Sequence, residues 1–200
     1  MGSWIEESIE DAATLTQWLA ESEQRTGIIQ QLGSHLAERL ADGAHVFTCG
    51  NGGSMCDAMH LAEELSGRFR KDRQPLAAQA ISDPAHLTCV ANDYGFEQVF
   101  ARGIEAWGRA GDVLVAFSTS GNSPNVVLAA QAARARAMSV VGILGRDGGQ
   151  LARLCDLSLV VPGRTSDRIQ EVHIKIVHLV IEAVERRLVP SNYPPDEKQS

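Results

Sequence analysis

His60 and Glu64 stand four positions apart in the segment MCDAMHLAEELSGRF (55–69), whose apolar residues recur with a helical period. Residues i and i+4 lie on one face of a helix, so the imidazole and the carboxylate are expected side by side. Glu63 would point about 100° away, toward solvent. A neighbouring His and Glu could transfer a proton or bind a metal ion, although an ordinary surface pair has the same spacing.

A second set of polar residues, Gln170, His173 and His178, interrupts the apolar helix that we expect over 167–188. Buried polar side chains must find a hydrogen-bond partner or a ligand. A single histidine in such a helix is more often a hydrogen-bonded core residue than a catalyst. Gln170 and His178 are eight residues apart, about 12 Å along a helix. If both act in one site, they are expected to come from different subunits of an oligomer.

The segment STSGNS (118–123) follows an apolar strand and is rich in hydroxyl groups. Gly121 permits a tight turn, Ser123 suits the N-cap of the next helix, and Pro124 suits its first turn. A helix N-terminus with free N–H groups and nearby hydroxyls can hold a phosphate without Lys or Arg. The alternative is a Ser-rich turn with a routine cap.

A second glycine-rich loop, GNGGS (50–54), also stands between a strand and a helix. It is not a dinucleotide-binding fingerprint, because Met55 occupies the place of the third glycine, and no G-K-[ST] follows to make a P-loop. We therefore expect no nucleotide cofactor. Two such loops at neighbouring strand ends indicate a ligand site at that edge of the sheet.

Alternating strands and helices must position these loops. Helices are expected at 55–69, 84–92, 95–109, 124–137, 148–154 and 167–188, and strands at 45–50, 75–82, 112–118, 139–145 and 157–162. This alternation predicts an α/β fold with a doubly wound, parallel sheet of about five strands.

The sequence divides into a helical extension (1–42), an α/β domain (43–188) and a polar, proline-containing tail (189–200) that we expect to be disordered or draped on the surface. The extension reads as two amphipathic helices. The first has an apolar stripe through Ile5, Ile9 and Leu15 that needs another surface to cover it, and a partner subunit is one candidate.

Composition narrows the class of protein. The 200-residue chain carries a net charge of −7 with no block of like charges, so it gives no electrostatic case for a nucleic-acid partner. Its four cysteines match no metal or disulfide spacing, and its acidic N-terminus is unlike a signal peptide. No apolar run is long enough to span a bilayer. We expect a cytoplasmic protein that is not bound to a membrane.

Four motifs together resemble the sedoheptulose 7-phosphate isomerase (phosphoheptose isomerase) family of SIS-domain proteins: GNGGSMCDAMHLAEEL, ISDPAHLTCVANDYGF, GDVLVAFSTSGNSPNV and DRIQEVHIKIVH. The resemblance covers roughly residues 1–188 with the motifs in the same order. STSGNS alone marks only the wider SIS group, whereas the first and last motifs together are far more specific. The resemblance implies a flavodoxin-like five-stranded parallel sheet with N-terminal helices, a homotetramer, and conversion of sedoheptulose 7-phosphate to D-glycero-D-manno-heptose 7-phosphate. That reaction begins the synthesis of lipopolysaccharide or nucleotide-activated heptoses.

The resemblance also implies residue roles, and no matching position departs from the family pattern. Glu64 and His178 would be the catalytic pair. Zinc would bind His60, Glu64, Gln170 and His178. Substrate would contact Asn51, Gly52, Gly53, Ser54, Glu64, Asn92, Asp93, Ser118, Thr119, Ser120, Ser123, Asp167 and Gln170. Glu64 as base with His178 as acid, and a zinc-assisted scheme, compete for the same two residues.

Two alternatives stay open. A related SIS protein is a tetrameric, non-catalytic scaffold that binds the bacterial replication initiator, and other SIS domains sense phosphosugars in transcription regulators. The scaffold lacks the acid–base pair that this chain has at Glu64 and His178, and a regulator would need a DNA-binding segment. An SIS isomerase for another phosphosugar is the second alternative, since spacing does not reveal substrate length.

Overall fold

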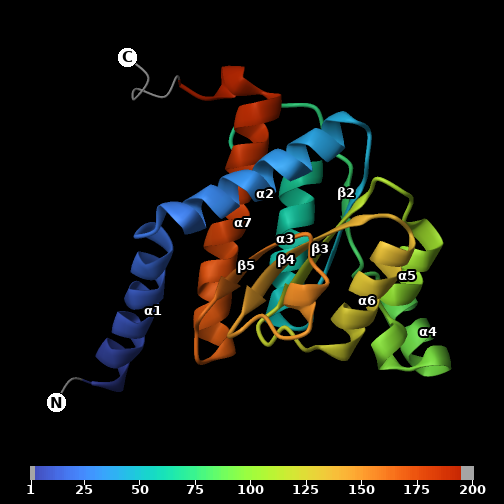
Figure 1. The fold of residues 1–200 in the computed structure, drawn as a ribbon, viewed down its shortest axis with the longest axis horizontal. Helices are drawn as coiled ribbons and strands as arrows, with labels where there is room; N and C mark the ends of the chain where they lie inside the picture. Colours follow the sequence, from blue (N-terminus) through green and yellow to red (C-terminus); the bar gives the residue numbers. More distant parts are fainter. Residues whose placement is uncertain (1–2, 195–200) are drawn as a thin grey trace.

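A five-stranded, all-parallel sheet in the order β2-β1-β3-β4-β5 forms the centre of the computed structural model, which describes residues 3–194 (Figure 1). The strands are β1 (Val46–Cys49), β2 (Ala78–Ala80), β3 (Val113–Ser118), β4 (Ser139–Gly145) and β5 (Leu157–Val161). This confirms the predicted doubly wound sheet. The chain runs outward from β1 to β2 and then returns to β3 on the other side of β1. The loops after β1 and β3 therefore meet at the point where the strand order reverses, which is where such sheets bind ligands.

Helices cover both faces of the sheet. The helices α2 (Glu23–Ala41), α3 (Gly53–Ser66) and α7 (Ser166–Leu188) pack on one face, and α4 (Pro84–Tyr94), α5 (Ala101–Trp107) and α6 (Pro124–Ala135) on the other. Alternate residues of β3 serve the two layers: Val115 and Phe117 join the first core, and Leu114 and Ala116 the second. All four are fully buried, as expected for a central parallel strand with both faces covered.

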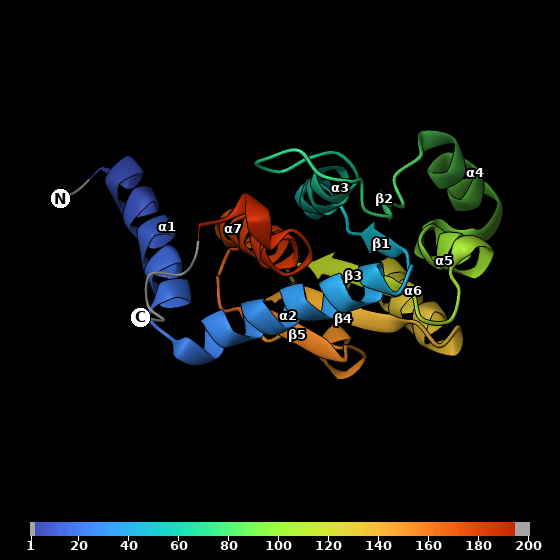
Figure 2. The same ribbon diagram turned by 90° about the horizontal axis from the view of Figure 1, so that it is seen from above.

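Helices α3 and α7 lie side by side (Figure 2) and run in the same direction (Figure 1). Near their starts, the Gln170 side chain lies against the backbone of Gly53, where an added Cβ would come within 2.5 Å of the Gln170 Oε1. Farther along, the ring of His60 meets that of His178 at a centroid distance of 5.1 Å. The sequence-distant polar residues of the two helices are thus paired along one parallel interface.

Helix α1 (Trp4–Ala20) lies at one edge of the molecule, beside α7 and away from α4, α5 and α6 (Figures 1 and 2). A capping box between Ser3 and Glu6 fixes its start. The Arg168 Nη1 donates to the Ser8 carbonyl at 3.1 Å and ties the helix to α7. Ile5 and Ile9 of the predicted apolar stripe remain 49% and 63% exposed, and so does the neighbouring Trp4 at 77%, so this part of the stripe is uncovered in a single chain.

Several predicted boundaries were wrong. Helix α3 begins at Gly53, two residues early, because Gly52 turns the chain with φ 55°, and it ends before Gly67 instead of at residue 69. The helix expected over 95–109 is instead a 3-10 turn, η1 (Phe96–Gln98), followed by α5, because Gly95 takes φ 93°. The helix expected over 148–154 shrinks to η2 (Leu151–Arg153).

The predicted tail is not disordered where it is described. Residues 190–192 form a short 3-10 helix, η3 (Pro190–Asn192), and Tyr193 returns to contact α7. Residues 195–200 of the tail, and residues 1–2 of the predicted extension, lie outside the described part of the chain. Among residues 3–194, no helix combines the length and apolar character needed to cross a membrane.

Candidate active site at the carboxyl ends of the strands

The loop 118–123 is closed by its own hydroxyl groups. The Ser118 Oγ accepts from the Gly121 N–H at 3.1 Å and lies 3.2 Å from the Ser123 Oγ. Gly121 has φ 65°, and a Cβ there would lie 2.0 Å from the Gly148 carbonyl oxygen. Ser123 is the N-cap of α6, as predicted, with Pro124 in the first turn. Its hydroxyl does not cap the helix but bonds Ser118 instead, so the first-turn N–H groups are left without a side-chain cap, as an anion site needs.

The other hydroxyls of this loop lie at its rim. Thr119 and Ser120 are half-buried, and the Thr119 Oγ1 lies 3.1 Å from the Ser166 Oγ at the start of α7. The Ser120 Oγ accepts from the Asn122 N–H at 3.2 Å. The arrangement joins two helix N-termini, those of α6 and α7, around a cluster of hydroxyl groups, and this is a suitable environment for a phosphate.

The loop after β1 is tied directly to the start of α6. The Asn51 and Asn125 side-chain amides exchange two hydrogen bonds, each of 2.8 Å, and Asn125 is only 2% exposed. Gly52 and Gly53 are exposed, whereas Ser54 is 4% exposed in the first turn of α3. Asn51, Gly52 and Gly53 therefore line the same edge of the sheet as the hydroxyl loop, as their predicted contact with the sugar requires.

The second half of α3 faces α7 through a cluster of His60, Glu64 and His178. The two histidine Nε2 atoms are 3.0 Å apart, and the Glu64 Oε1 is 3.5 Å from the His60 Nε2. The Glu64 side chain is 16% exposed, whereas that of Glu63 is 63% exposed. Glu64 is thus the inner carboxylate, and the prediction that Glu63 faces solvent is confirmed.

The environment of this cluster shifts two pKa values toward each other. Desolvation, with Glu63 adding a smaller repulsion, raises the pKa of Glu64. Desolvation, with the His60 ring and Arg70 adding to it, lowers the pKa of His178. A carboxylate whose pKa is raised is a stronger base, and an imidazole that is neutral near pH 7 can still donate its N–H.

The remaining predicted residues are not all brought together. Gln170 lies near the start of α3, about 10 Å along that helix from His60. Asp167 is exposed, and hydrogen bonds from Thr165 and Arg168 lower its pKa to about 2. Asn92 and Asp93 are exposed on α4 and bond each other at 2.6 Å. Their described bonds are local, so a single chain does not bring them to Glu64.

Sequence reasoning did not find Asp57 or Asn125. Asp57 is 7% exposed in α3, its Oδ2 has no hydrogen-bond partner among residues 3–194, and burial raises its pKa to about 7. A signal was present, because Asp57 precedes His60 by three residues and so shares its side of the helix. Asn125 follows the hydroxyl loop immediately, but nothing in the sequence shows that it bonds Asn51.

His173 is the hydrogen-bonded core residue that a single helical histidine suggests. It is fully buried, and its Nε2 lies 3.0 Å from the Leu144 carbonyl oxygen. Burial lowers its pKa to about 4. It therefore supports the packing of α7 on β4 and takes no part in the cluster.

The cluster has the donors that zinc prefers. Zinc takes imidazole and carboxylate ligands in a tetrahedron, in which neighbouring donors are about 3.3 Å apart. The described donor atoms of His60, Glu63 and Glu64 lie within 4.8 Å of one another, and the His178 Nε2 adjoins His60. Around the His60 Nε2, the Glu64 Oε1 lies at 3.5 Å and the His178 Nε2 at 3.0 Å, each close to the separation of neighbouring ligands in such a site. Gln170 of the same chain does not reach it.

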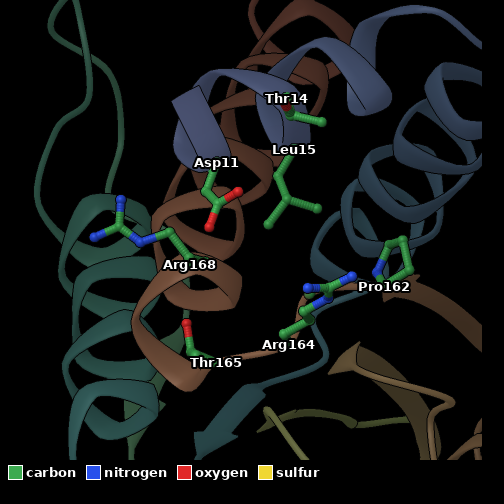
Figure 3. A pocket seen from close by; sticks show the side chains of 8 residues that line it. Asp11, Thr14, Leu15, Pro162, Arg164, Thr165 and Arg168 are labelled. Carbon is green, nitrogen blue, oxygen red and sulfur yellow. The ribbon is translucent and has the colours of Figure 1, made fainter. Parts of the chain in front are cut away.

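A separate pocket lies between α1 and the loop that precedes α7 (Figure 3). It is lined by Asp11, Thr14, Leu15, Pro162, Gly163, Arg164, Thr165 and Arg168. Arg168 connects it to the candidate site, because it bonds both Asp167 on α7 and the Ser8 carbonyl on α1. The helical extension therefore adjoins the start of α7, close to the hydroxyl loop.

Comparisons with known proteins identify the family. The family described as the SIS domain matches residues 10–145. The phosphoheptose isomerase of Fusobacterium nucleatum is 51% identical over 179 residues, which are 90% of this chain and 92% of the relative. The chain belongs to the phosphoheptose isomerase family. The phosphoheptose isomerase of Tolumonas auensis is 49% identical over 87% of this chain and 91% of the relative.

Solved structures of phosphoheptose isomerases share this fold. The Francisella tularensis structure has a TM-score of 0.86 at 33% identity, covering 91% of this chain and 96% of its own. The Neisseria gonorrhoeae structure has a TM-score of 0.77 at 39% identity, covering 90% and 94%. The Vibrio vulnificus NanR protein, solved with ManNAc-6P, is 20% identical with a TM-score of 0.66, covers 96% and 65%, and shares the fold alone. The predicted family and fold class are confirmed.

Proposed function

We propose that this phosphoheptose isomerase family member converts D-sedoheptulose 7-phosphate to D-glycero-D-manno-heptose 7-phosphate through an enediol. The observation that carries the proposal is the pairing of an inner carboxylate, Glu64, with the His60–His178 contact on the parallel helices α3 and α7, which begin at the sheet edge that carries the glycine loop and the hydroxyl loop. The high identity to proteins named phosphoheptose isomerase supports the seven-carbon substrate.

Glu64 is the base in this account. A ketose-to-aldose conversion removes a proton from C1, passes through an enediol, and returns a proton to C2. The raised pKa of Glu64 strengthens its carboxylate as the acceptor. The His178 N–H would donate its proton to O2 as negative charge develops there, which gives the enediol. The same nitrogen would then take the proton from O1 while the Glu64 carboxyl returns its proton to C2, so that both groups regain their starting states. The hydroxyl loop and the N-terminus of α6 hold the phosphate away from the reacting carbons.

A zinc-assisted scheme is the competing account of the same site: His60, Glu64 and His178 would hold the ion, with Gln170 from another subunit as a fourth ligand, and Glu64 and His178 would then act as ligands in place of the free acid–base pair. When bound, zinc would supply Lewis-acid polarisation of the substrate carbonyl. The two donors that adjoin the His60 Nε2, the Glu64 Oε1 at 3.5 Å and the His178 Nε2 at 3.0 Å, support this scheme. No nucleotide cofactor is proposed.

The site is proposed to be shared between subunits of a homotetramer. Within one chain, Glu64 lies eleven residues beyond Gly53, about 16 Å along α3. The phosphate of an extended heptose 7-phosphate lies only roughly 9 Å from its C1–C2 bond by ordinary bond lengths. This separation along α3 favours a site in which the hydroxyl loop of one subunit serves the Glu64–His178 pair of another. The exposed Trp4 and Ile9 on α1 supply apolar surface for such an assembly.

The enzyme is proposed to act in the cytoplasm, early in bacterial heptose synthesis for lipopolysaccharide or nucleotide-activated heptoses. Four free cysteines are consistent with a reducing compartment. A non-catalytic scaffold would not need Glu64 shielded beside two histidines, and an isomerase for a shorter phosphosugar remains the alternative that substrate comparison decides.

The test is a turnover assay in which the purified chain is incubated with sedoheptulose 7-phosphate and the aldose product is followed by NMR. Fructose 6-phosphate and ribulose 5-phosphate are assayed in parallel. We expect kcat/KM to be highest for the seven-carbon ketose. A higher kcat/KM for one of the shorter sugars would reassign the substrate. Absence of turnover with all three sugars, with and without added zinc, would favour a scaffold or a phosphosugar sensor.

A further inference from the structure

Tyr193, in the tail beyond α7, reaches back to a buried ion pair. Its hydroxyl donates to the Glu185 Oε2 at 2.6 Å, and the Glu185 Oε1 accepts from the Arg73 Nε at 2.7 Å. The Glu185 and Arg73 side chains are 0% and 1% exposed. A buried pair of this kind needs further hydrogen bonds to satisfy its remaining atoms, and Tyr193 supplies one of them.

Arg73 carries this contact to the end of α3. Its Nη1 donates to the Leu65 carbonyl at 2.8 Å and its Nη2 to the Glu64 carbonyl at 2.6 Å. The last carbonyls of a helix lack intrahelical partners, so a guanidinium placed there fixes the final turn. The backbone of Glu64 is therefore held by a chain of hydrogen bonds that begins at Tyr193.

The Tyr193 ring leads to His178 by a second route. The Arg70 guanidinium lies 5.9 Å from the centre of the Tyr193 ring and 5.1 Å from that of Phe69. The Phe69 ring is stacked on His178 at 5.9 Å with an interplanar angle of 27°. Arg70 is anchored by Glu182 at 2.8 Å. Tyr193 thus contacts both Glu185, which leads through Arg73 to the Glu64 backbone, and Arg70, which leads through Phe69 to His178.

We propose that Tyr193 is a positioning residue that sets the orientation of Glu64 and His178 from behind. The inference rests on the proposed roles of those two residues in the isomerase reaction. It extends the functional part of the chain beyond residue 188, into the tail. It also assigns the residues through which Tyr193 acts: Glu185 and Arg73 on the first route, and Arg70 and Phe69 on the second.

The proposal predicts a loss in kcat with little change in KM, because Tyr193 does not contact the hydroxyl loop that holds the phosphate. Tyr193→Phe removes only the hydroxyl and is expected to lower kcat about 3–10-fold, since misplacement of a catalytic group by 1 Å can cost about 100-fold. Tyr193→Leu also removes the ring and is expected to lower kcat further. KM should stay within about twofold in both.

The experiment measures kcat, KM and Tm for the full chain with each Tyr193 substitution. Met138→Ala is the stability control, because Met138 is 5% exposed in the opposite helical layer and touches neither route. It should lower Tm at least as much as Tyr193→Phe without changing kcat. The proposal is supported if Tyr193→Phe lowers kcat, Tyr193→Leu lowers it further, and Met138→Ala leaves it unchanged.

Unchanged kcat in both Tyr193 variants, or an effect confined to KM, would overturn it. Glu64→Gln is measured beside them to separate this proposal from the proposed function. If Glu64→Gln is inactive while the Tyr193 variants are fully active, only the role of Tyr193 fails. If Glu64→Gln is active, the proposed catalytic role of Glu64 fails first.

Discussion

Asn51 and Asn125 are joined by two reciprocal hydrogen bonds of 2.8 Å across the point where the strand order of the sheet reverses. Asn51 belongs to the loop after β1 and Asn125 to the first turn of α6, after β3. Each side-chain amide donates one N–H to the oxygen of the other and accepts one N–H from it. The pair thus fixes the glycine loop relative to the hydroxyl loop, and the two can act as one binding surface.

Asn125→Ala should weaken substrate binding more than it slows turnover. It leaves the half-buried Asn51 amide without its partner, which costs about 1–3 kcal/mol, and it frees the two loops from each other. We expect KM to rise about tenfold with kcat within about threefold, and Tm to fall by several degrees. Steady-state kinetics and calorimetry measure both. An unchanged KM would show that this pair does not organise the binding surface.

Asp57→Asn should stabilise the protein at alkaline pH. Burial raises the folded-state pKa of Asp57 from 3.8 to about 7, so the folded state binds this proton more tightly than the unfolded state. The stabilisation from the protonated carboxyl is complete below about pH 4 and is lost as pH rises through 7. An amide has no such titration. The Tm difference between variant and wild type should therefore grow between pH 5 and pH 8, by about 2–6 °C.

A constant Tm difference across that range would mean that Asp57 is not the protonated, buried carboxyl described here. Activity is measured on the same samples, because a group that costs stability at neutral pH is often retained for function. Loss of turnover in a stabilised Asp57→Asn protein would give Asp57 a place in the chemistry of α3.

The alternation of apolar strands and amphipathic helices was enough to predict the sheet, since buried parallel strands such as 112–118 are continuously apolar. The boundaries at Gly52 and Gly95 were missed because a glycine with positive φ can begin an element or interrupt one, and sequence does not show which. The sequence also could not predict that α3 packs against α7. That His60 meets His178 and that Gln170 meets Gly53 depends on the helix register, which only packing determines.

Tyr193 illustrates the same limit at the chain end. The segment PSNYPPDEKQS has the composition of a disordered tail. Tyr193 is held in place because its hydroxyl donates to the buried Glu185, whose other carboxylate oxygen accepts from Arg73. The composition of the tail does not show that Tyr193 would find this partner on α7.

Zinc should bind through His60. We expect His60→Gln to weaken zinc affinity by at least about tenfold, because it replaces a good imidazole donor with a poor one. Titration calorimetry on chelator-treated protein measures this directly, without reference to activity. His35→Gln is the control, since His35 bonds Ser139 far along the chain from the cluster. Equal zinc binding by both variants would remove His60 from the metal site.

Two inactive variants should restore activity when their subunits are mixed. If Gln170 of one subunit completes the site of Glu64 and His178 in another, Glu64→Gln and Gln170→Ala subunits can form intact sites together. After denaturation and joint refolding, about a quarter of the sites should be intact for a random, symmetric assembly. Recovery near that level supports shared sites. No recovery, with tetramers present in sedimentation analysis, would place each site within one chain.

Glu64→Gln tests the central claim most directly. The variant keeps the shape of the side chain and removes the base, so we predict that kcat for sedoheptulose 7-phosphate falls at least about 1000-fold, while the Kd for the phosphosugar stays within about threefold. Glu105→Gln, at an exposed position on α5, serves as the matched control and should keep full turnover. Substantial kcat in the Glu64→Gln protein would contradict the account, because the carboxylate of Glu63, which also lies beside His60, is 63% exposed and would not replace the shielded Glu64.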